Sequence, residues 1–245
     1  MNRRIRPLSA QNSRPSGKLP DTRTTDSFRL KHTLDQWTQQ WRRRYARGNV
    51  IVVRYADDSV FGFKSEETAR RFLTAMKEQL ARFGLTLNAT KTRLIEFGRF
   101  AATNRKRRGQ SKPETFDFLG FTHYCGTDRQ GRFQVTRLTV KKRMRATLEA
   151  IRAELMRRRH ESVAIVGKWL NRVVQGYFNY HAVPGNLYRL AGMRSELGRA
   201  WRHALVRRSQ RHRLPWPRFS RIAERFIPTR KMHLYPEERF YVLHT

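Results

Sequence analysis

The chain has 245 residues, of which 53 are Lys or Arg and 19 are Asp or Glu, and its formal net charge at pH 7 is +34. Such a charge repels itself unless a polyanion neutralises it, so nucleic acid is the expected partner. At this length the chain can form one large domain or two modest ones. Its single cysteine, Cys125, excludes an intramolecular disulfide and a multi-cysteine zinc site.

The amino-terminal residues 1–33 are rich in Arg, Ser, Thr and Pro and show no apolar period. This composition predicts a disordered basic arm. The arm has no apolar stretch of signal-peptide length, and no long apolar segment or basic amphipathic anchor follows, so we expect a cytoplasmic protein with no membrane partner. Residues 34–45 carry Trp37, Trp41 and three consecutive arginines, which favours a short helix.

Residues 50–63 predict a β-hairpin. A β-branched run, residues 50–53, leads into Tyr55, Ala56, Asp57 and Asp58, and a second apolar run follows. Two adjacent carboxylates at the end of buried strands repel each other and are costly to desolvate unless a cation lies there. Mg²⁺ in polymerase-type sites meets that condition. The alternative is a surface turn in which the two aspartates only cap backbone groups.

A helix is expected after the hairpin, because Ser65 is a good N-cap and Gly84 can end the helix. Apolar residues recur between them at helical spacing, namely Ala69, Phe72, Met76, Leu80 and Phe83. Strands are predicted at 85–87, 94–97, 116–121 and 133–137, with a turn at 126–131. Residues 98–113 predict a solvated basic loop that RNA would order; its basic cluster is Arg105, Lys106, Arg107 and Arg108.

From Thr139 onward the pattern is helical. Three apolar stripes are expected to face a core: Met144, Leu148, Ile151 and Leu155; then Val166, Leu170, Val173 and Tyr177, capped by Ser162; then Leu190, Leu197, Trp201 and Leu205. A shorter helix with Phe219, Ile222 and Phe226 precedes Pro228.

Arginine dominates the charge of the helical region. Residues 140–245 hold 24 Lys or Arg against seven Asp or Glu, and Arg suits phosphate because its planar fork binds bidentately. Arg145, Arg152 and Arg159 recur every seven residues, which places them on one helix face, away from the apolar stripe. We therefore expect these three to contact RNA, the alternative being a face that only keeps the helix soluble.

Four blocks of the sequence resemble the group II intron reverse transcriptases, also called maturases. Tyr55-Ala-Asp-Asp58 resembles the catalytic hairpin, and the other blocks are residues 83–92, 116–121 and 175–180. The resemblance runs from about Leu34 to about Pro228. It implies an α+β fold, with a partial right-hand polymerase palm at 34–138 followed by an all-α thumb (maturase) domain at 139–228. A carboxyl-terminal tail, 229–245, completes the chain.

The resemblance also implies roles for particular residues. Asp57 and Asp58 would be catalytic and would hold Mg²⁺, if the chain is catalytically competent. Lys91 would lie near the incoming nucleotide and neutralise or protonate its phosphates. The turn formed by Phe118, Leu119 and Gly120 would be the primer grip. For Lys91 a surface position after a turn, and for Gly120 an ordinary strand glycine, are alternatives of similar weight.

The sequence also departs from that family. Its polymerases need a third metal-binding carboxylate and fingers that hold template and nucleotide, and nothing before Leu34 supplies them. We therefore expect a truncated reverse transcriptase/maturase that is inactive alone, with group II intron RNA, a DNA primer or target, and a separate fingers fragment as partners. The alternatives are an RNA-binding maturase fragment or decayed gene copy, and a generic basic DNA-binding protein. The last is disfavoured because no helix-turn-helix or zinc pattern is present.

Overall fold

The structure, a computed structural model, describes residues 3–5, 23–46, 48–55, 58–128, 130–209 and 213–231, with backbone alone for 3–5 and 23–33. It mixes helices and strands, as the α+β prediction requires. The chain divides into two compact units. The first unit is Met1–Leu119 with Tyr124–Val135, and the second unit is Gly120–His123 with Thr136–Thr245.

A four-stranded sheet organises the first unit. Its order is β2 (Ile51–Tyr55), β3 (Asp58–Phe63), β1 (Arg3–Ile5) and β4 (Leu94–Glu96). The short strand β1 pairs antiparallel with both β3 and β4. The prediction of a disordered arm over residues 1–33 is therefore wrong at β1, because backbone hydrogen bonds to two neighbours outweigh a polar composition.

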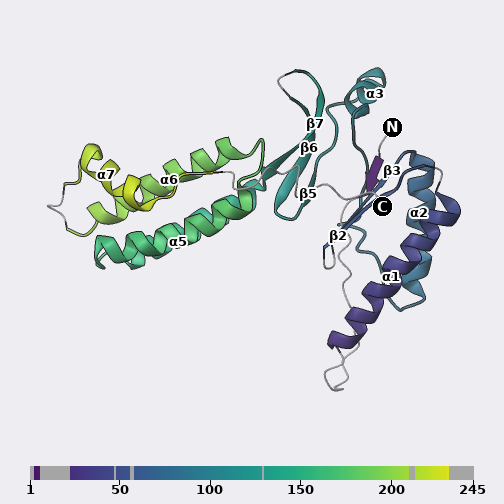
Figure 1. Ribbon diagram of the computed structural model, residues 1–245, viewed down its shortest axis with the longest axis horizontal. Coiled ribbons are helices and arrows are strands. Elements are labelled where there is room, and N and C mark those ends of the chain that lie inside the picture. Colours follow the sequence, from purple (N-terminus) through teal and green to yellow (C-terminus); the bar gives the residue numbers. More distant parts are fainter. Residues whose placement is uncertain are drawn as a thin grey trace. The chain divides into compact units, whose positions relative to one another are not determined.

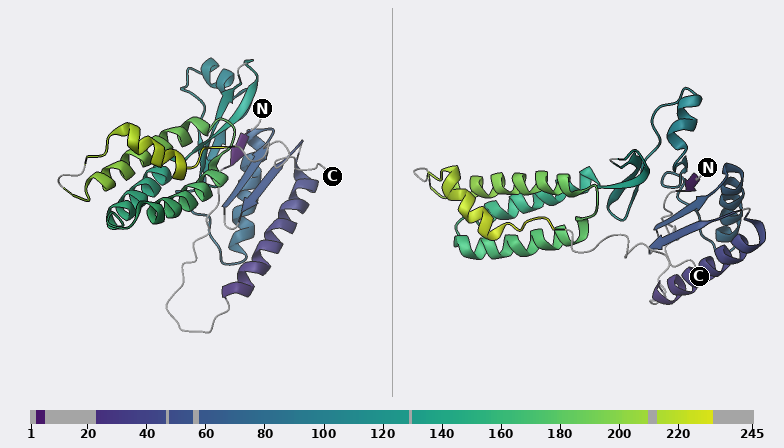
Figure 2. Two further views of the ribbon diagram at one scale, coloured as in Figure 1. Left: turned by 60° about the vertical axis from the view of Figure 1, so that its left-hand side comes forward. Right: turned by 45° about the horizontal axis from the view of Figure 1, so that its top comes forward.

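Two helices pack next to this sheet (Figures 1 and 2). Helix α1 (Arg23–Tyr45) begins well before the predicted start at Leu34, so the disordered-arm prediction is also wrong from Arg23 on. Helix α2 (Glu66–Ala81) begins at the predicted cap, where Ser65 Oγ accepts from the Thr68 N–H at 3.3 Å. The Phe72 ring joins both helices to β3, with centroids 4.9 Å from Trp41 and 4.8 Å from Phe61. Such aromatic pairs stabilise beyond simple burial.

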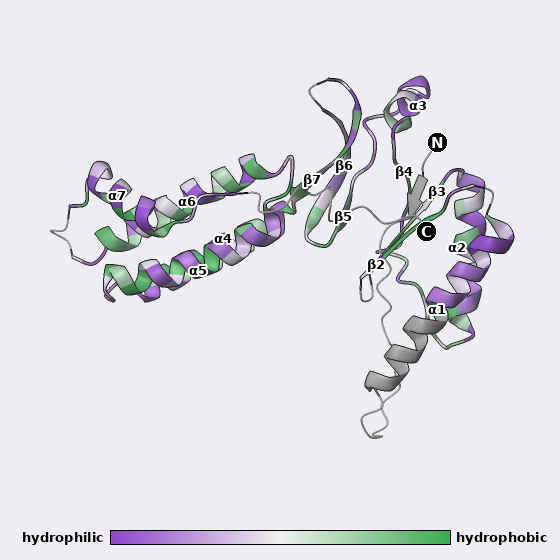
Figure 3. Cartoon of the chain, in the orientation of Figure 1, coloured by the Kyte–Doolittle hydropathy of each residue, from purple (hydrophilic) through white to green (hydrophobic). Residues whose placement is uncertain are grey.

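Strand β2 differs from the expectation of two buried strands. Its residues Ile51, Val52 and Val53 are 38–42% exposed, whereas Phe61 and Phe63 of β3 are buried. The reason is position in the sheet: among the described strands β2 has a neighbour on one side only, while β3 lies between two. Both strands are hydrophobic in Figure 3, so β2 presents an apolar edge of the kind that proteins usually cover.

Two further predictions in the first unit are corrected. Residues 98–113 are not wholly a loop, because helix α3 (Ala101–Arg107) lies within them between Gly98 and Gly109, which both have positive φ. Residues 85–87 carry only an isolated bridge, at Leu87. The strands β5 (Phe116–Phe118), β6 (Phe121–Thr127) and β7 (Phe133–Thr139) form a second sheet in that order. The single strand predicted at 116–121 is broken at Leu119 and Gly120, which have positive φ, whereas the strand predicted at 133–137 is confirmed as β7.

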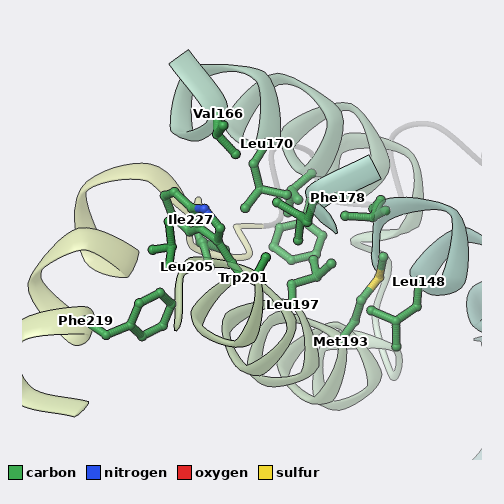
Figure 4. Packing of buried hydrophobic residues seen from close by; sticks show 14 of the residues in the cluster. Leu148, Val166, Leu170, Phe178, Met193, Leu197, Trp201, Leu205, Phe219 and Ile227 are labelled. Carbon is green, nitrogen blue, oxygen red and sulfur yellow. The ribbon is translucent and has the colours of Figure 1, made fainter. Parts of the chain in front are cut away.

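Four helices build the second unit: α4 (Lys141–Arg157), α5 (Val163–His181), α6 (Leu187–Val206) and α7 (Trp216–Phe226). Figure 4 shows their common core, in which most members of the predicted stripes are buried. In α5 the fully buried row is Val166, Leu170, Val174 and Phe178. The predicted members Val173 and Tyr177 are partly buried and pack against the same core. Gly167, beside Val166, is buried against the Phe226 ring of α7, where a Cβ atom would lie only 2.5 Å from the ring.

The junction between β7 and the helices depends on the buried side chain of Asn186. Asn186 Oδ1 accepts from the Thr139 N–H at 3.0 Å, while its amide nitrogen donates to Thr139 Oγ1 at 2.7 Å and to the His181 carbonyl at 2.8 Å. Arg189 also donates to the Thr139 carbonyl. Thr139 and Asn186 are 0% exposed, so water cannot replace these partners.

Replacing Asn186 with Ala should destabilise the second unit by about 2–4 kcal/mol, because several buried polar groups lose their partner at once. The free energy of unfolding in urea measures this loss. Asn179→Ala is the matched control: Asn179 is exposed and only accepts from Gln175, so its removal should cost less than about 0.5 kcal/mol. Equal stabilities of the two variants would contradict the assignment.

Candidate functional site

The predicted hairpin is present. Strands β2 and β3 pair antiparallel with Tyr55 opposite Asp58, and Ala56 and Asp57 connect them. Asp57 lies outside the described residues, whereas Asp58 is the first residue of β3 and is half-buried. Ser59 and Val60, which follow, are 2% and 5% exposed. The hairpin thus places Asp58 at the point where a buried strand reaches the sheet end.

The acidic residues at this end are few. Among the described residues no group of three or more His, Cys, Asp or Glu gathers where it could hold a metal ion. The strand beside β3 is Arg3-Arg4-Ile5, and residues 1–20 contain no Asp or Glu. Two adjacent aspartates with water ligands fit one Mg²⁺ ion, since Mg²⁺ keeps several waters and takes one or two carboxylates. A two-metal centre needs more oxygen ligands than this hairpin offers.

Sheet topology relates Lys91 to Asp58. Because β1 is antiparallel to both β3 and β4, these two run in the same direction, and Ile5 lies opposite both Phe61 and Leu94. Asp58 is three residues before Phe61, and Lys91 is three residues before Leu94, so both lie at the same end of the sheet. Strands β3 and β4 are two strand spacings apart, about 10 Å, where both pair with β1.

The Lys91 backbone is held by its own turn, and its side chain is exposed. Its N–H donates to the carbonyl (3.1 Å) and to Oδ1 (3.2 Å) of Asn88. The side chain can therefore reach an anion at this end of the sheet, although its role near a nucleotide stays a prediction.

The turn predicted as a primer grip has unusual backbone. Leu119 has φ +48° and Gly120 has φ +76°, as in the two-residue turns that connect hairpin strands. For Leu119 this left-handed conformation is strained. The Phe118 ring packs in an apolar cluster with Val60, Ile95, Phe97 and Phe116. The side chain of Phe118 is therefore part of the core, and only the backbone of the turn could touch a ligand.

The α3 cluster divides into structural and exposed residues. Arg108 pairs with Glu96, whose side chain is 6% exposed and also accepts from Asn104 Nδ2 at 3.1 Å. Arg105 donates to the Ser111 carbonyl at 3.0 Å. Lys106 and Arg107 are exposed. Glu96, which sequence analysis missed, thus binds Arg108 internally and leaves Lys106 and Arg107 as the residues suited to phosphate.

The α4 arginines do not form the uniform face that was predicted. Helix α4 ends at Arg157, so Arg159 lies beyond it, where its guanidinium donates to the Met156 carbonyl at 3.1 Å. Arg152 forms an ion pair with Glu196 of α6 at 2.7 Å. Of the three, Arg145 is exposed, and none of the described acidic side chains pairs with it. A seven-residue repeat cannot show where a helix ends or which partner a neighbouring helix brings.

Aromatic side chains gather near Gly120 in the second unit. The Tyr180 ring is stacked with Phe121 at 5.7 Å, and His181 is stacked with Tyr177 at 4.0 Å. Burial lowers the pKa of His181, with a further lowering by Arg143, while a hydrogen bond to the Tyr177 carbonyl opposes the shift. Burial also raises the pKa of Tyr177 to about 12, and the neighbouring Thr139 side chain opposes the shift. Both rings are therefore uncharged packing groups, whereas Tyr180 is 54% exposed.

Sequence analysis missed the exposed basic residues of α5, Lys168 and Arg172. The sequence could have indicated that Lys168 and Arg172 are unpaired within their helix, because residues 163–181 contain no Asp or Glu. A helix of this length without an acidic residue keeps its positive charge uncompensated on its own surface.

Comparison with known proteins supports part of this description. Residues 28–123 match the family model described as Reverse transcriptase (RNA-dependent DNA polymerase). The matched segment includes the β2–β3 hairpin, α2, β4 and β5, so this part of the chain is similar to reverse transcriptase domains. No curated protein matches the chain. Among the described helices none is both long and apolar enough to cross a membrane.

The Glu96–Arg108 pair can be tested by substitution. Arg108→Gln should lower the free energy of unfolding by about 1–3 kcal/mol, because a buried carboxylate loses its cation while the half-exposed guanidinium regains water. Arg107→Gln, the exposed neighbour, should change it by less than about 0.5 kcal/mol. Urea unfolding of both variants measures the difference, and an Arg108 variant as stable as the Arg107 variant would show that Glu96 does not need this partner.

Proposed function

We propose that the chain is a nucleic-acid-binding protein descended from a group II intron-encoded reverse transcriptase, and that it binds intron RNA and assists its splicing. The observation that carries the proposal is the reverse transcriptase match across the hairpin with Asp58, in a chain with a net charge of +34. The strands and α2 act as a palm, and the helices of the second unit act as a thumb.

Polymerase chemistry at the hairpin would need the side chains of Asp57, Asp58 and Lys91. The two carboxylates would hold Mg²⁺, which when bound activates the attacking hydroxyl and stabilises charge on the phosphate. Lys91, at the same end of the sheet, would neutralise a triphosphate or protonate departing pyrophosphate. The described part of β1, Arg3–Ile5, pairs with Phe61–Phe63 and does not reach the level of Asp58, and residues 1–20 contain no Asp or Glu. A separate fingers fragment is the partner that would restore the missing ligand.

RNA binding does not require a third metal-binding carboxylate. Phosphate contacts need exposed cations, and the described surface offers Lys106, Arg107 and Arg145. Structured intron RNA is a suitable polyanion because it presents many phosphates and unpaired bases together. We therefore propose RNA binding as the activity of this chain by itself, with DNA synthesis as the ancestral activity.

Primer extension separates these two activities. With Mg²⁺, deoxynucleotides and an RNA template annealed to a DNA primer, the purified chain should give no extended product. Asp57→Ala and Asp58→Ala should leave RNA affinity within about twofold, or raise it slightly, because each removes a negative charge. Synthesis by the wild type that Asp57→Ala abolishes would refute the absence of activity and show that Asp57 and Asp58 suffice as carboxylates.

The salt dependence of RNA binding tests the exposed α3 residues. The double variant Lys106→Gln and Arg107→Gln should flatten the slope of log K against log salt by about 1.4 to 1.8, because each lost phosphate contact contributes 0.7 to 0.9. The control, Arg70→Gln with Arg71→Gln on α2, removes the same charge elsewhere. If both double variants give the same slope, α3 has no direct contact with RNA.

A further inference from the structure

One side of helix α5 has features that its packing does not explain. Lys168, Arg172, Gly176 and Tyr180 recur every four residues, and all four are exposed. We call these four residues the α5 ridge. On the opposite side, Val166, Leu170, Val174 and Phe178 are buried in the core. The ridge extends over about 18 Å, since twelve residues each rise 1.5 Å.

The charge of the ridge is not compensated inside the protein. Helix α5 has no acidic residue, and none of the described acidic side chains pairs with Lys168 or Arg172. The nearest acidic residue along the chain, Glu161, lies 3.6 Å from Arg158 in an ion pair. Two exposed cations one helical turn apart therefore suit successive phosphates of one strand.

Gly176 lies between these cations and Tyr180. A Cβ atom at this position would meet nothing within 4 Å, so no neighbouring side chain requires a glycine. Glycine inside a helix is less stable than alanine. Gly176 lowers the stability of the helix, and no neighbouring group of the protein occupies the space that a Cβ atom would fill. A ligand that approaches the helix backbone at this point would explain the glycine.

Tyr180 ends the ridge with an aromatic surface. Its ring is stacked with Phe121, with planes 22° apart, and it is 54% exposed. Arg143 and His181 lie close by, because a Cβ atom at Gly120 would be 3.6 to 3.9 Å from Arg143, Tyr180 and His181. The ring also lies edge-on to His181, with centroids 4.8 Å apart. A ring that its neighbours hold in place and that is half exposed is a surface on which an unpaired base can stack.

We infer that the α5 ridge binds single-stranded nucleic acid, with phosphates on Lys168 and Arg172, the backbone passing Gly176 and a base stacked on Tyr180. This deepens the proposed function by naming the surface that holds the RNA. A duplex does not use Tyr180 in this way, because its bases already stack on one another. A membrane does not fit either, because the apolar side of α5 is buried in the core.

The charge contribution is tested on the full-length chain with an oligouridylate of about ten nucleotides. Lys168→Gln combined with Arg172→Gln should flatten the salt slope by about 1.4, since each phosphate contact to a single strand contributes 0.7. Arg218→Gln with Arg221→Gln on α7 is the matched control, because both arginines are exposed on the same unit. The control should change the slope by less than half as much.

The glycine gives a test that does not depend on charge. Gly176→Ala should raise the melting temperature by a few degrees and lower oligouridylate affinity several-fold, because the new methyl group holds the strand away from the helix. Gly192→Ala on α6 is the control, since a Cβ there also meets nothing within 4 Å. It should raise the melting temperature equally and leave affinity unchanged.

Base stacking is tested with Tyr180→Leu, which keeps an apolar contact to Phe121. It should lower affinity for oligouridylate roughly fivefold or more, and should have less than a twofold effect on an abasic strand of the same length. Variants that all bind like wild type would overturn the ridge while leaving the proposed function intact. A duplex that loses as much affinity as the single strand would overturn the single-strand assignment, and a wild type that binds no RNA would overturn both proposals.

Discussion

Three hydrogen bonds made by one buried amide side chain fix the place in the second unit where β7, α4 and α5 meet. The Asn186 side chain bonds Thr139 at the end of β7 and the His181 carbonyl at the end of α5. Directly after Thr139, the Val140 N–H donates to the Gly120 carbonyl at 3.0 Å and α4 begins. The start of α4, the end of α5 and the glycine turn are therefore held at one corner. Tyr180 can cover Gly120 only because these backbone positions are set by a polar group that water cannot reach.

The excess of arginine serves two purposes, and the structure separates them. Arg158 pairs with Glu154 and lies 5.0 Å from the ring centroid of Trp169, and Arg152 joins α4 to Glu196 of α6. These residues stabilise the unit, because a planar guanidinium can bond a carboxylate and stack on a ring. The few acidic residues of the helical region are thus largely engaged by arginines. Lys168, Arg172 and Arg145 are exposed, and no described acidic side chain pairs with them.

The first unit combines a chemically suggestive hairpin with an unusual neighbour strand. In the sheet, β3 carries Asp58 and is buried, and β1 beside it is basic. The described residues of β1 lie opposite Phe61–Phe63, so this part of β1 brings no further carboxylate to the level of Asp58. Among the described strands, β2 has a neighbour on one side only and exposes apolar side chains along that edge, where a further strand could pair.

Local patterns determined much of this protein. Ser65 and Ser162 predicted the starts of α2 and α5, the spacing of Leu148, Ile151 and Leu155 predicted the buried side of α4, and the β-branched run predicted the hairpin. These features depend on neighbours within a few residues, which the sequence shows directly. Only the tertiary structure decided that Arg3–Ile5 forms a strand, that Glu96 holds Arg108, that Arg152 meets Glu196 and that α5 keeps an uncompensated basic ridge. Each of these features depends on residues that are distant in the sequence. Their backbone hydrogen bonds and ion pairs form only after the fold has brought the partners together, so local patterns cannot show them.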